Sequence, residues 1–291
     1  MISVLIPIFN YDVTSLIGQL DHMGNNLEVP YEIICLDDNS KDSYQKKNRA
    51  ILDFAYTQYE VLPYNVGRSK IRNMLADIAQ YPHLLFLDCD CSIAAPDFLQ
   101  RYVQMASEDI VLVGGREYTQ DRPKDDRMVL HWKIGRQRER HLRSGFQSNN
   151  FLIPANIFHR IKFDELLSGY GHEDTLFGYQ LEQHAVEIKH IRNPVIHLDL
   201  QTAEEFISKQ KNAIRNLILL KTRFPEIETR LTKTYDWLLS KNLTKLFDRL
   251  FRFLEQSIYW MLIGPYSSAP LLDFYKIGYY VQAKNEKETI V

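Results

Sequence analysis

The chain has 291 residues, 45% of them hydrophobic and 25% charged, an ordinary composition for a globular protein with one large domain and a smaller appendage. The formal net charge of −2 excludes a global attraction to nucleic acid, so a site for polyanions would have to be local. Three cysteines, Cys35, Cys89 and Cys91, show neither a disulfide framework nor a CxxC pair, which favours a reducing compartment. The N-terminus has no signal-peptide pattern and no apolar run reaches the roughly 20 residues of a membrane span, so we expect a cytoplasmic protein.

The first two hundred residues alternate short apolar runs with helical patterns. The runs are rich in Val, Ile and Leu, as strands buried on both faces of a sheet are, and they cover 2–8, 32–36, 60–62, 84–87 and 110–113. Helical spacing occupies 14–23, 43–56, 67–80 and 96–106. This alternation predicts βαβ units in a three-layer α/β domain over residues 1–200, with a mostly parallel sheet flanked by helices.

Beyond residue 200 only helical spacing is present, over 202–222, 226–240 and 243–263. We expect residues 201–291 to form a helical C-terminal extension that ends in a mobile polar tail from Lys284. The segment 243–263 is rich in aromatic side chains interspersed with Lys and Arg. A helix of this kind can lie in a membrane interface, where lipid-linked acceptors are found, but packing within the protein explains the same residues. Both interpretations stay open.

Polar clusters follow the ends of three predicted strands, at 10–12, 37–40 and 88–90. Ligands of open α/β sheets bind outside the carboxyl ends of strands, so these clusters should converge. Asp88 and Asp90, at i and i+2 after a buried strand, suit a divalent cation that keeps positions open for phosphate oxygens. A turn, in which Asp is common, accounts for the same two residues.

Two further segments carry polar groups at predicted helix starts. Asn65 is a candidate N-cap for the helix over 67–80, and Arg68 and Arg72 share one face of it, where arginines attract phosphate. Solvated surface charge is the alternative for Arg68. In Gly169-Tyr170-Gly171-His172-Glu173-Asp174, the two acids precede a helical pattern, and the helix dipole keeps a carboxylate ionised there. An ionised Asp that faces a cleft can accept the proton of a hydroxyl, although both acids can also merely stabilise the helix start.

Together these clusters resemble glycosyltransferase family 2, whose members have the GT-A fold. The motifs stand in the family's order at 4–10, 37–40, 65–73, 88–90 and 169–174. Only Cys89 between the two acids is unusual, and its side chain should point away from the ligands. The resemblance implies a nucleotide site and a metal site. The nucleotide site would comprise Pro7, Ile8, Asn10, Asp38, Asn65, Gly67, Arg68, Arg72 and Asp88, and the metal ligands would be Asp90, Asp88 and His197.

The resemblance implies an inverting, metal-dependent glycosyltransferase that uses Mn²⁺ or Mg²⁺. A hexosyl or N-acetylhexosaminyl group would pass from a nucleotide-diphosphate donor, UDP-sugar by default, to a saccharide or lipid-linked acceptor in polysaccharide or glycoconjugate synthesis. Asp174 would be the general base, and Glu173 would hold the acceptor together with Asn149 or Asn150. A lone His197 in apolar context can equally be a core residue.

Three alternatives compete with this hypothesis. A haloacid-dehalogenase-like phosphatase also has an acidic pair after a strand, but Ser92 stands where Thr or Val is usual and the motif follows a fourth strand. A non-catalytic sugar-nucleotide-binding module would be expected to lack the acids Glu173 and Asp174. The basic segment 122–143 is compatible with a nucleic-acid-binding patch or with a solvated helix. We expect it instead to fold over the donor diphosphate, and we expect no nucleic-acid partner.

Overall fold

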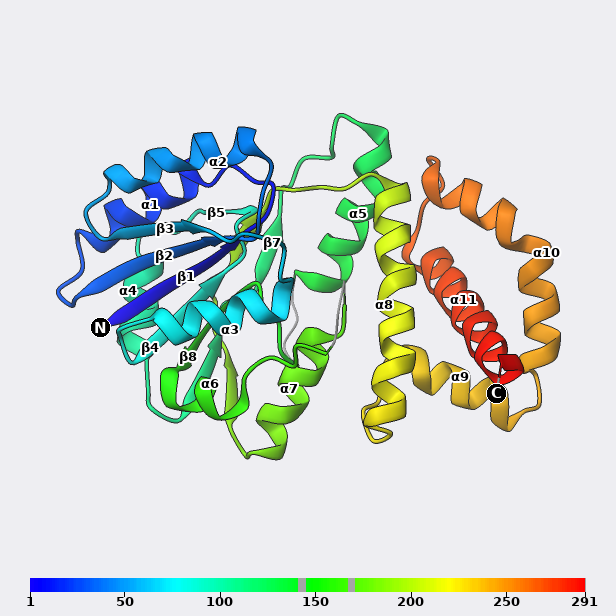
Figure 1. The fold of residues 1–291 in the computed structure, drawn as a ribbon. Coiled ribbons are helices and arrows are strands. Elements are labelled where there is room, and N and C mark those ends of the chain that lie inside the picture. The colour runs from blue at the N-terminus through cyan, green and yellow to red at the C-terminus, as the bar shows by residue number, and fades with distance from the viewer. Residues whose placement is uncertain (141–144, 167–170, 291) are drawn as a thin grey trace. The chain divides into compact units, whose positions relative to one another are not determined.

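The computed structural model describes residues 1–140, 145–166 and 171–290, with the backbone alone over 287–290. The chain divides into two compact units. The first comprises Met1–Thr119, Glu139–Ser168 and Glu173–Asp199. The second comprises Gln120–Arg138, Gly169–His172 and Leu200–Val291. Each unit has its own hydrophobic core, and each is described in turn (Figure 1).

A seven-stranded sheet forms the centre of the first unit. Its strand order is β3 (Thr57–Val61), β2 (Tyr31–Asp37), β1 (Ile2–Ile8), β4 (His83–Leu87), β8 (Asn150–Pro154), β6 (Ile110–Val113) and β9 (Glu187–His190). Only β8 runs antiparallel to its neighbours, and all the other pairs are parallel. The predicted α/β class with a mostly parallel sheet is confirmed.

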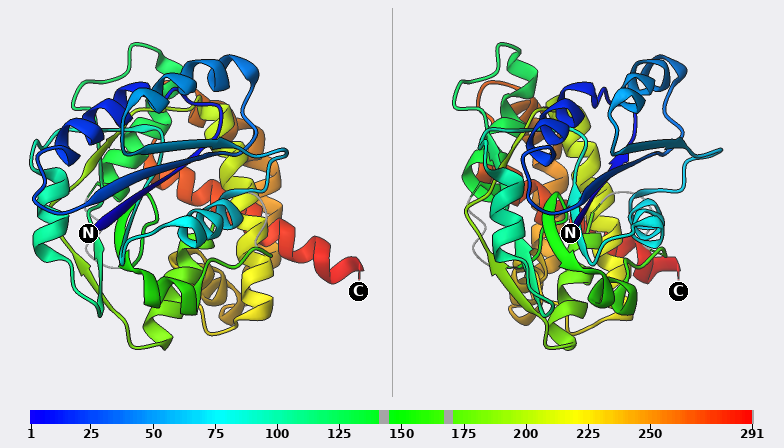
Figure 2. Two further views of the ribbon diagram at one scale, coloured as in Figure 1. Left: turned by 60° about the vertical axis from the view of Figure 1, so that its left-hand side comes forward. Right: turned by 90° about the vertical axis from the view of Figure 1, so that its left-hand side faces the viewer.

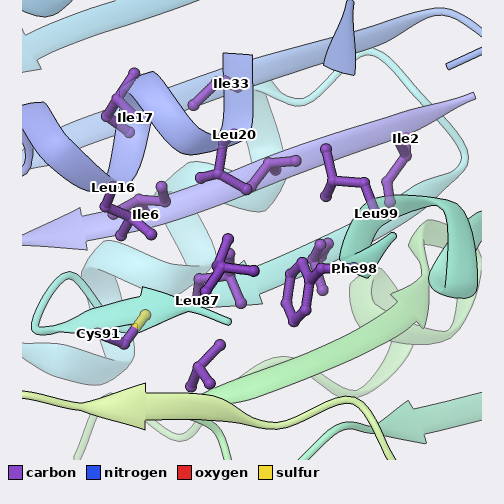
Figure 3. Close-up of a cluster of buried hydrophobic side chains, with 14 of the residues drawn as sticks. Ile2, Ile6, Leu16, Ile17, Leu20, Ile33, Leu87, Cys91, Phe98 and Leu99 are labelled. Carbon is purple, nitrogen blue, oxygen red and sulfur yellow. The ribbon is translucent and has the colours of Figure 1, made fainter. Parts of the chain in front are cut away.

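Helices cover both faces of this sheet because the strands are apolar on both sides. Ile2, Val4 and Ile6 of β1 share one core cluster with α1 (Thr14–Gly24) and α4 (Phe98–Met105). Figure 3 shows the α1 side chains over Ile6 in this cluster. On the other face a second cluster joins Leu5 to the helices α3 (Arg68–Ile78), α6 (Ala155–Ile161) and α7 (Glu173–Gln183). In both views of Figure 2, α1 and α3 lie on opposite sides of β1. Alternate side chains of one strand therefore hold two different helical layers.

A second, three-stranded sheet was not predicted. It consists of β5 (Cys91–Ile93), β10 (Val195–His197) and β7 (Arg116–Tyr118), in that order. β10 pairs antiparallel with β5, which places His197 opposite Cys91, and parallel with β7, which places His197 opposite Tyr118. Strands of three residues carry too little periodicity to be recognised in a sequence.

The second unit is helical. Its helices are α5 (Val129–Ile134), α8 (Ala203–Arg223), α9 (Arg230–Ser240), α10 (Thr244–Ile263) and α11 (Ala269–Ile290). Thr202 and Glu205 cap the start of α8 reciprocally. Gly278 of α11 lies against the ring of Phe251, where a Cβ atom would come within 2.1 Å. The predicted helical C-terminus is confirmed.

Several predicted element boundaries were wrong, among them the strand expected over 60–62, which the structure has at Thr57–Val61. The expected polar tail from Lys284 continues the helix α11 as far as Ile290. The helix expected over 43–56 is shorter, because α2 (Asp42–Asn48) passes into a 3-10 helix (Arg49–Asp53) before the chain extends into β3. No helix in the described part of the chain is long and apolar enough to cross a membrane.

Candidate functional site

The loops after β1 and β2 are bound to each other. The backbone N–H of Asn10 donates to Oγ of Ser40 at 2.7 Å, and Oδ1 of Asn10 accepts from the backbone N–H of Lys41 at 2.9 Å. Asn10 and Asn39 both have left-handed backbone angles, φ 52° and 61°, which Asn tolerates better than most residues. Pro7 and buried Ile8 precede this junction in β1. The two predicted polar clusters therefore do converge at the carboxyl edge of the sheet.

Asp38 holds the next loop in place. Its carboxylate oxygens accept from the backbone N–H of Val66 at 2.6 Å and of Gly67 at 3.0 Å, and its carbonyl accepts from the Asn65 amide at 3.1 Å. The prediction that Asn65 caps the helix was wrong: the N-cap of α3 is Gly67, whose φ of 86° suits glycine. The Asn65 side chain turns instead to the Asp38 backbone. Asp38 thus links the loop after β2 to the start of α3.

The two arginines of α3 have different environments. Arg72 is only 3% exposed and donates to Oδ1 of Asp88 at 2.8 Å. Arg68 is half exposed and lies 3.7 Å from Oε1 of Glu173. Asp88 is further held by its backbone N–H, which donates to the Asn149 carbonyl at 2.9 Å. Arg72 therefore orients Asp88, and Arg68 is the arginine with access to solvent.

Asp90 lies beside His197, as the family resemblance implied. Nδ1 of His197 is 3.4 Å from Oδ1 of Asp90, and the backbone N–H of Leu198 donates to the Asp90 carbonyl at 2.9 Å. Apart from the His197 contact, Oδ1 of Asp90 is buried without a hydrogen-bond partner among the described residues. Burial acts to raise the pKa of Asp90, but His197 and the nearby charge of Arg116 outweigh it, so the net pKa is lowered. An ionised, under-coordinated carboxylate next to an imidazole is a donor set that Mn²⁺ accepts.

These two side chains do not make a complete metal site by themselves. The described residues contain no group of three or more His, Cys, Asp and Glu side chains arranged to hold a metal ion. Asp88, the third predicted ligand, has one carboxylate oxygen engaged by Arg72. A cation bound here would need further oxygen ligands, from a substrate or from water.

A charged cluster beside Asp90 escaped the sequence analysis. Arg116 lies 3.3 Å from Oε2 of Glu139, and the Tyr118 hydroxyl donates to the same oxygen at 2.5 Å. Burial works to lower the pKa of Arg116, but Glu139, Tyr118 and Asp88 raise it, so this guanidinium stays charged. Its Nε is buried without a hydrogen-bond partner among the described residues. The only signal in the sequence was an isolated Arg in a short polar segment.

Glu173 and Asp174 begin α7, and their environments differ. Oδ2 of Asp174 accepts from the backbone N–H of Ser148 at 3.2 Å, and its Oδ1 is buried with no hydrogen-bond partner among the described residues. Glu173 faces Arg68, and its pKa is raised by burial and by the charge of Asp174. Gly169 and Tyr170, the start of this motif, lie outside the described residues. One carboxylate oxygen of Asp174 thus holds the Ser148 backbone, and the other is buried with its hydrogen-bonding capacity unused among the described residues.

The two asparagines that were predicted to bind the acceptor, Asn149 and Asn150, also have different environments. Asn150 accepts from the Tyr102 hydroxyl at 2.7 Å and donates to the carbonyls of Gly115 and Asn193 at 2.9 and 2.8 Å, so its amide is used within the fold. Both side-chain polar atoms of Asn149 are buried without a hydrogen-bond partner among the described residues. Asn149 is therefore the asparagine whose amide is not used in hydrogen bonds among the described residues.

The basic segment 122–143 is largely paired within the protein. Arg127 lies 2.6 Å from Oδ2 of Asp125, and Arg138 makes two hydrogen bonds of 2.6 Å to Asp273. The end of the segment falls outside the described residues. These pairings leave fewer free cations than the sequence suggested.

Comparison with known proteins gives a family. Residues 3–167, more than half of the chain, match the family model described as Glycosyl transferase family 2. Hyaluronan synthase from Pasteurella multocida is 23% identical over 223 residues, which cover 62% of this chain and 22% of that protein. The chain thus spans about a fifth of the length of this curated relative.

Solved structures give the fold. The mannosyltransferase PcManGT from Pyrobaculum calidifontis, in complex with GDP-Man and Mn²⁺, is similar over 99% of this chain and 86% of its own, with a TM-score of 0.62 and 13% identity. TarS 1–349 from S. aureus, in complex with UDP-GlcNAc, is similar over 99% and 91%, with a TM-score of 0.53 and 16% identity. The fold is the GT-A fold expected from the sequence. With the family match over residues 3–167, these findings identify the chain as a member of glycosyl transferase family 2.

Proposed function

We propose that this chain is an inverting glycosyltransferase that moves a hexosyl or N-acetylhexosaminyl group from a UDP-sugar to a hydroxyl of a saccharide or lipid-linked acceptor. One observation supports this most strongly. Two arginines of α3 link the acids after β4 to those at the start of α7, through Arg72–Asp88 and Arg68–Glu173, and His197 contacts Asp90. Residues 1–200 would form the catalytic domain, and residues 201–291 would serve acceptor access in polysaccharide or glycoconjugate synthesis.

The donor would lie along the carboxyl ends of β1, β2 and β4. Pro7, Ile8 and Asn10 would border the base, and Asp38 would set the loop that faces the ribose. Asp88, held by Arg72, would contact the ribose as well. Carboxyl ends of parallel strands are where ligands of such sheets bind.

Asp90 and His197 would hold Mn²⁺ or Mg²⁺ together with diphosphate oxygens of the donor. When bound, the cation would neutralise the negative charge that develops on the leaving diphosphate. The Oδ1 of Asp90 is buried beside His197 and has no hydrogen-bond partner among the described residues, which supports this assignment. The guanidinium of Arg116 lies close enough to lower the pKa of Asp90, and it would add a second positive charge there.

Asp174 would act as the general base. Its Oδ1 would accept the proton of the acceptor hydroxyl. The hydroxyl oxygen would at the same time bond to the anomeric carbon, and the bond between that carbon and the diphosphate oxygen would break. The bonding electrons leave with the nucleoside diphosphate, so the reaction needs no other reactant. Glu173 and Asn149 would hold the acceptor by hydrogen bonds.

Nucleotide calorimetry followed by a donor screen tests this function. UDP is titrated into the protein with Mn²⁺ and with EDTA, and UDP- and GDP-sugars are then tested for metal-dependent hydrolysis. We expect tighter UDP binding with Mn²⁺ and hydrolysis of at least one UDP-sugar. Release of inorganic phosphate from simple phosphate esters would favour the phosphatase alternative. Nucleotide-sugar binding without any turnover or transfer would favour the non-catalytic module.

A further inference from the structure

The helix α10 has two apolar faces, and the described residues of the protein cover one of them. Phe251, Ile258 and Leu262 are buried in the core of the second unit. On the opposite side four large apolar residues are exposed at spacings of 4, 3 and 7 along the helix: Leu246 (64%), Leu250 (47%), Phe253 (84%) and Trp260 (62%). Because seven residues make about two turns, these side chains form a single stripe. Contiguous exposed apolar surface of this kind marks an interaction site.

A row of basic residues borders this stripe. Lys245, Arg249 and Arg252 follow each other at spacings of 4 and 3, one position away from Leu246, Leu250 and Phe253. Arg252 pairs with Asp248 at 3.1 Å. Within the described residues, Lys245 and Arg249 have no ion-pair partner. The exposed side of α10 therefore combines an apolar centre with uncompensated positive charge.

This combination fits an anionic lipid surface better than a second copy of the chain. In a symmetric contact centred on α10, each copy would bring its own basic row to the same interface. Like charges at a desolvated contact oppose association. In a membrane, the apolar stripe would enter the acyl boundary while Lys245 and Arg249 meet anionic headgroups.

We propose that the exposed face of α10, formed by Leu246, Leu250, Phe253 and Trp260 with Lys245 and Arg249, binds the surface of anionic membranes. The helix lies in the plane of the interface and does not cross it. This inference does not depend on the identity of the donor or on the roles of the acidic residues. It would bring the enzyme to the surface where lipid-linked acceptors reside.

Vesicle sedimentation with the full chain tests the proposal. The vesicles consist of phosphatidylcholine alone or of phosphatidylcholine with phosphatidylglycerol. We expect binding to the second kind, weakened by high salt because exposed charges are screened. Lys245→Gln and Arg249→Gln should each weaken it about fivefold, the effect of one basic residue near an anionic surface.

Two leucines provide a matched control. Leu250 on α10 is 47% exposed and Leu219 on α8 is 49% exposed, so their replacement by Ser removes the same side chain at similar exposure. Leu250→Ser should weaken vesicle binding, and Leu219→Ser should leave it unchanged. Hydrolysis of the donor in solution should be the same in both variants, which separates this test from the proposed chemistry.

Three results would overturn the proposal. The first is equal binding to neutral and anionic vesicles or to neither. The second is an equal response of the two Leu variants. The third is a parent protein that sediments as a dimer in solution, becomes monomeric on Leu250→Ser and does not bind vesicles, because α10 would then be a contact between copies.

Discussion

The acidic pairs Asp88/Asp90 and Glu173/Asp174 differ in how neighbouring side chains balance their negative charges. In the first pair each acid has its own cationic or imidazole neighbour, Arg72 for Asp88 and His197 for Asp90. In the second pair the acids are adjacent, and Arg68, the ion-pair neighbour of Glu173, is half exposed and 3.7 Å away. The pKa of Asp90 is accordingly lowered and that of Glu173 is raised.

This difference suits the two proposed tasks. A metal ligand has to stay ionised, and close positive neighbours ensure that it does. The proposed proton acceptor, Asp174, needs an oxygen that can accept a proton, and its Oδ1 has no hydrogen-bond partner among the described residues. The raised pKa belongs to its neighbour Glu173, which is proposed to hold the acceptor. The structure thus distinguishes acids that residue type alone leaves equivalent.

The largest expected effect is on the base. Asp174→Asn should lower the transfer rate by about 10²–10⁴-fold, because the amide cannot accept the acceptor proton. The Ser148 hydrogen bond can be kept by the amide oxygen, so the fold and donor affinity should change little. Transfer kinetics at saturating donor, with UDP calorimetry as the control, measure this. An Asp174→Asn enzyme with parental rates would exclude Asp174 as the base.

Asp90→Ala tests the first acidic pair and should weaken binding of the metal and the donor. It removes a proposed direct ligand, so Mn²⁺-dependent UDP affinity should fall by about 100-fold, the upper end of what even indirect metal partners contribute. UDP binding in EDTA should be unchanged. Calorimetry with and without Mn²⁺ measures both values, and circular dichroism checks the fold. Unchanged Mn²⁺ dependence in a folded variant would refute the metal assignment.

Substitutions of the two arginines of α3 test how burial changes the contribution of an ion pair to the free energy of unfolding. Arg72→Met leaves Asp88 without its cation and should cost about 2 kcal/mol of the free energy of unfolding, less than for a fully buried pair because Asp88 retains some solvent. Arg68→Met removes a solvent-exposed partner and should change it by less than about 1 kcal/mol. Urea denaturation of both variants measures this. Equal costs would show that Arg72 is not specifically bound to Asp88.

Glu173→Gln should have the smallest effect on the reaction, raising the acceptor KM by about tenfold with less loss at saturation. Its effect on stability should depend on pH. Burial and Asp174 raise the pKa of folded Glu173, so its stabilising protonation is present at low pH and is lost as pH rises through the folded pKa. Gln has no such loss, so the unfolding free energy of Glu173→Gln relative to the parent should increase with pH. A Glu173→Gln enzyme that is inactive at every acceptor concentration would reverse the roles of the two acids.

Much of the fold could be predicted because it follows from local patterns. Strands such as β1 and β6 are continuous apolar runs bounded by polar residues, and the sheet concentrates the clusters that follow them at one edge. The motif order was enough to expect the family that the comparison shows. By contrast, β5, β7 and β10 have three residues each and are defined by pairing between distant segments.

The candidate site was predicted as a set of residues but not as a set of contacts. Arg72 and Arg68 share a helix face in the sequence, yet one is buried against Asp88 and the other is half exposed. Asn149 and Asn150 are adjacent, and only tertiary hydrogen bonds show which amide is occupied. Arg116 and Glu139 approach each other only in the folded chain, so no spacing rule could find them.

The short strand β10 makes the proposed cation site dependent on long-range folding. A shift of its pairing by one residue would turn His197 to the opposite face of the small sheet. Asp90 and His197 are far apart in the chain, so their contact closes a long loop whose entropic cost only the folded state offsets. A cation that binds both residues would stabilise the native state over the unfolded chain and would slow amide hydrogen exchange in β10. Binding of the cation would therefore couple the occupancy of the proposed site to the stability of the small sheet.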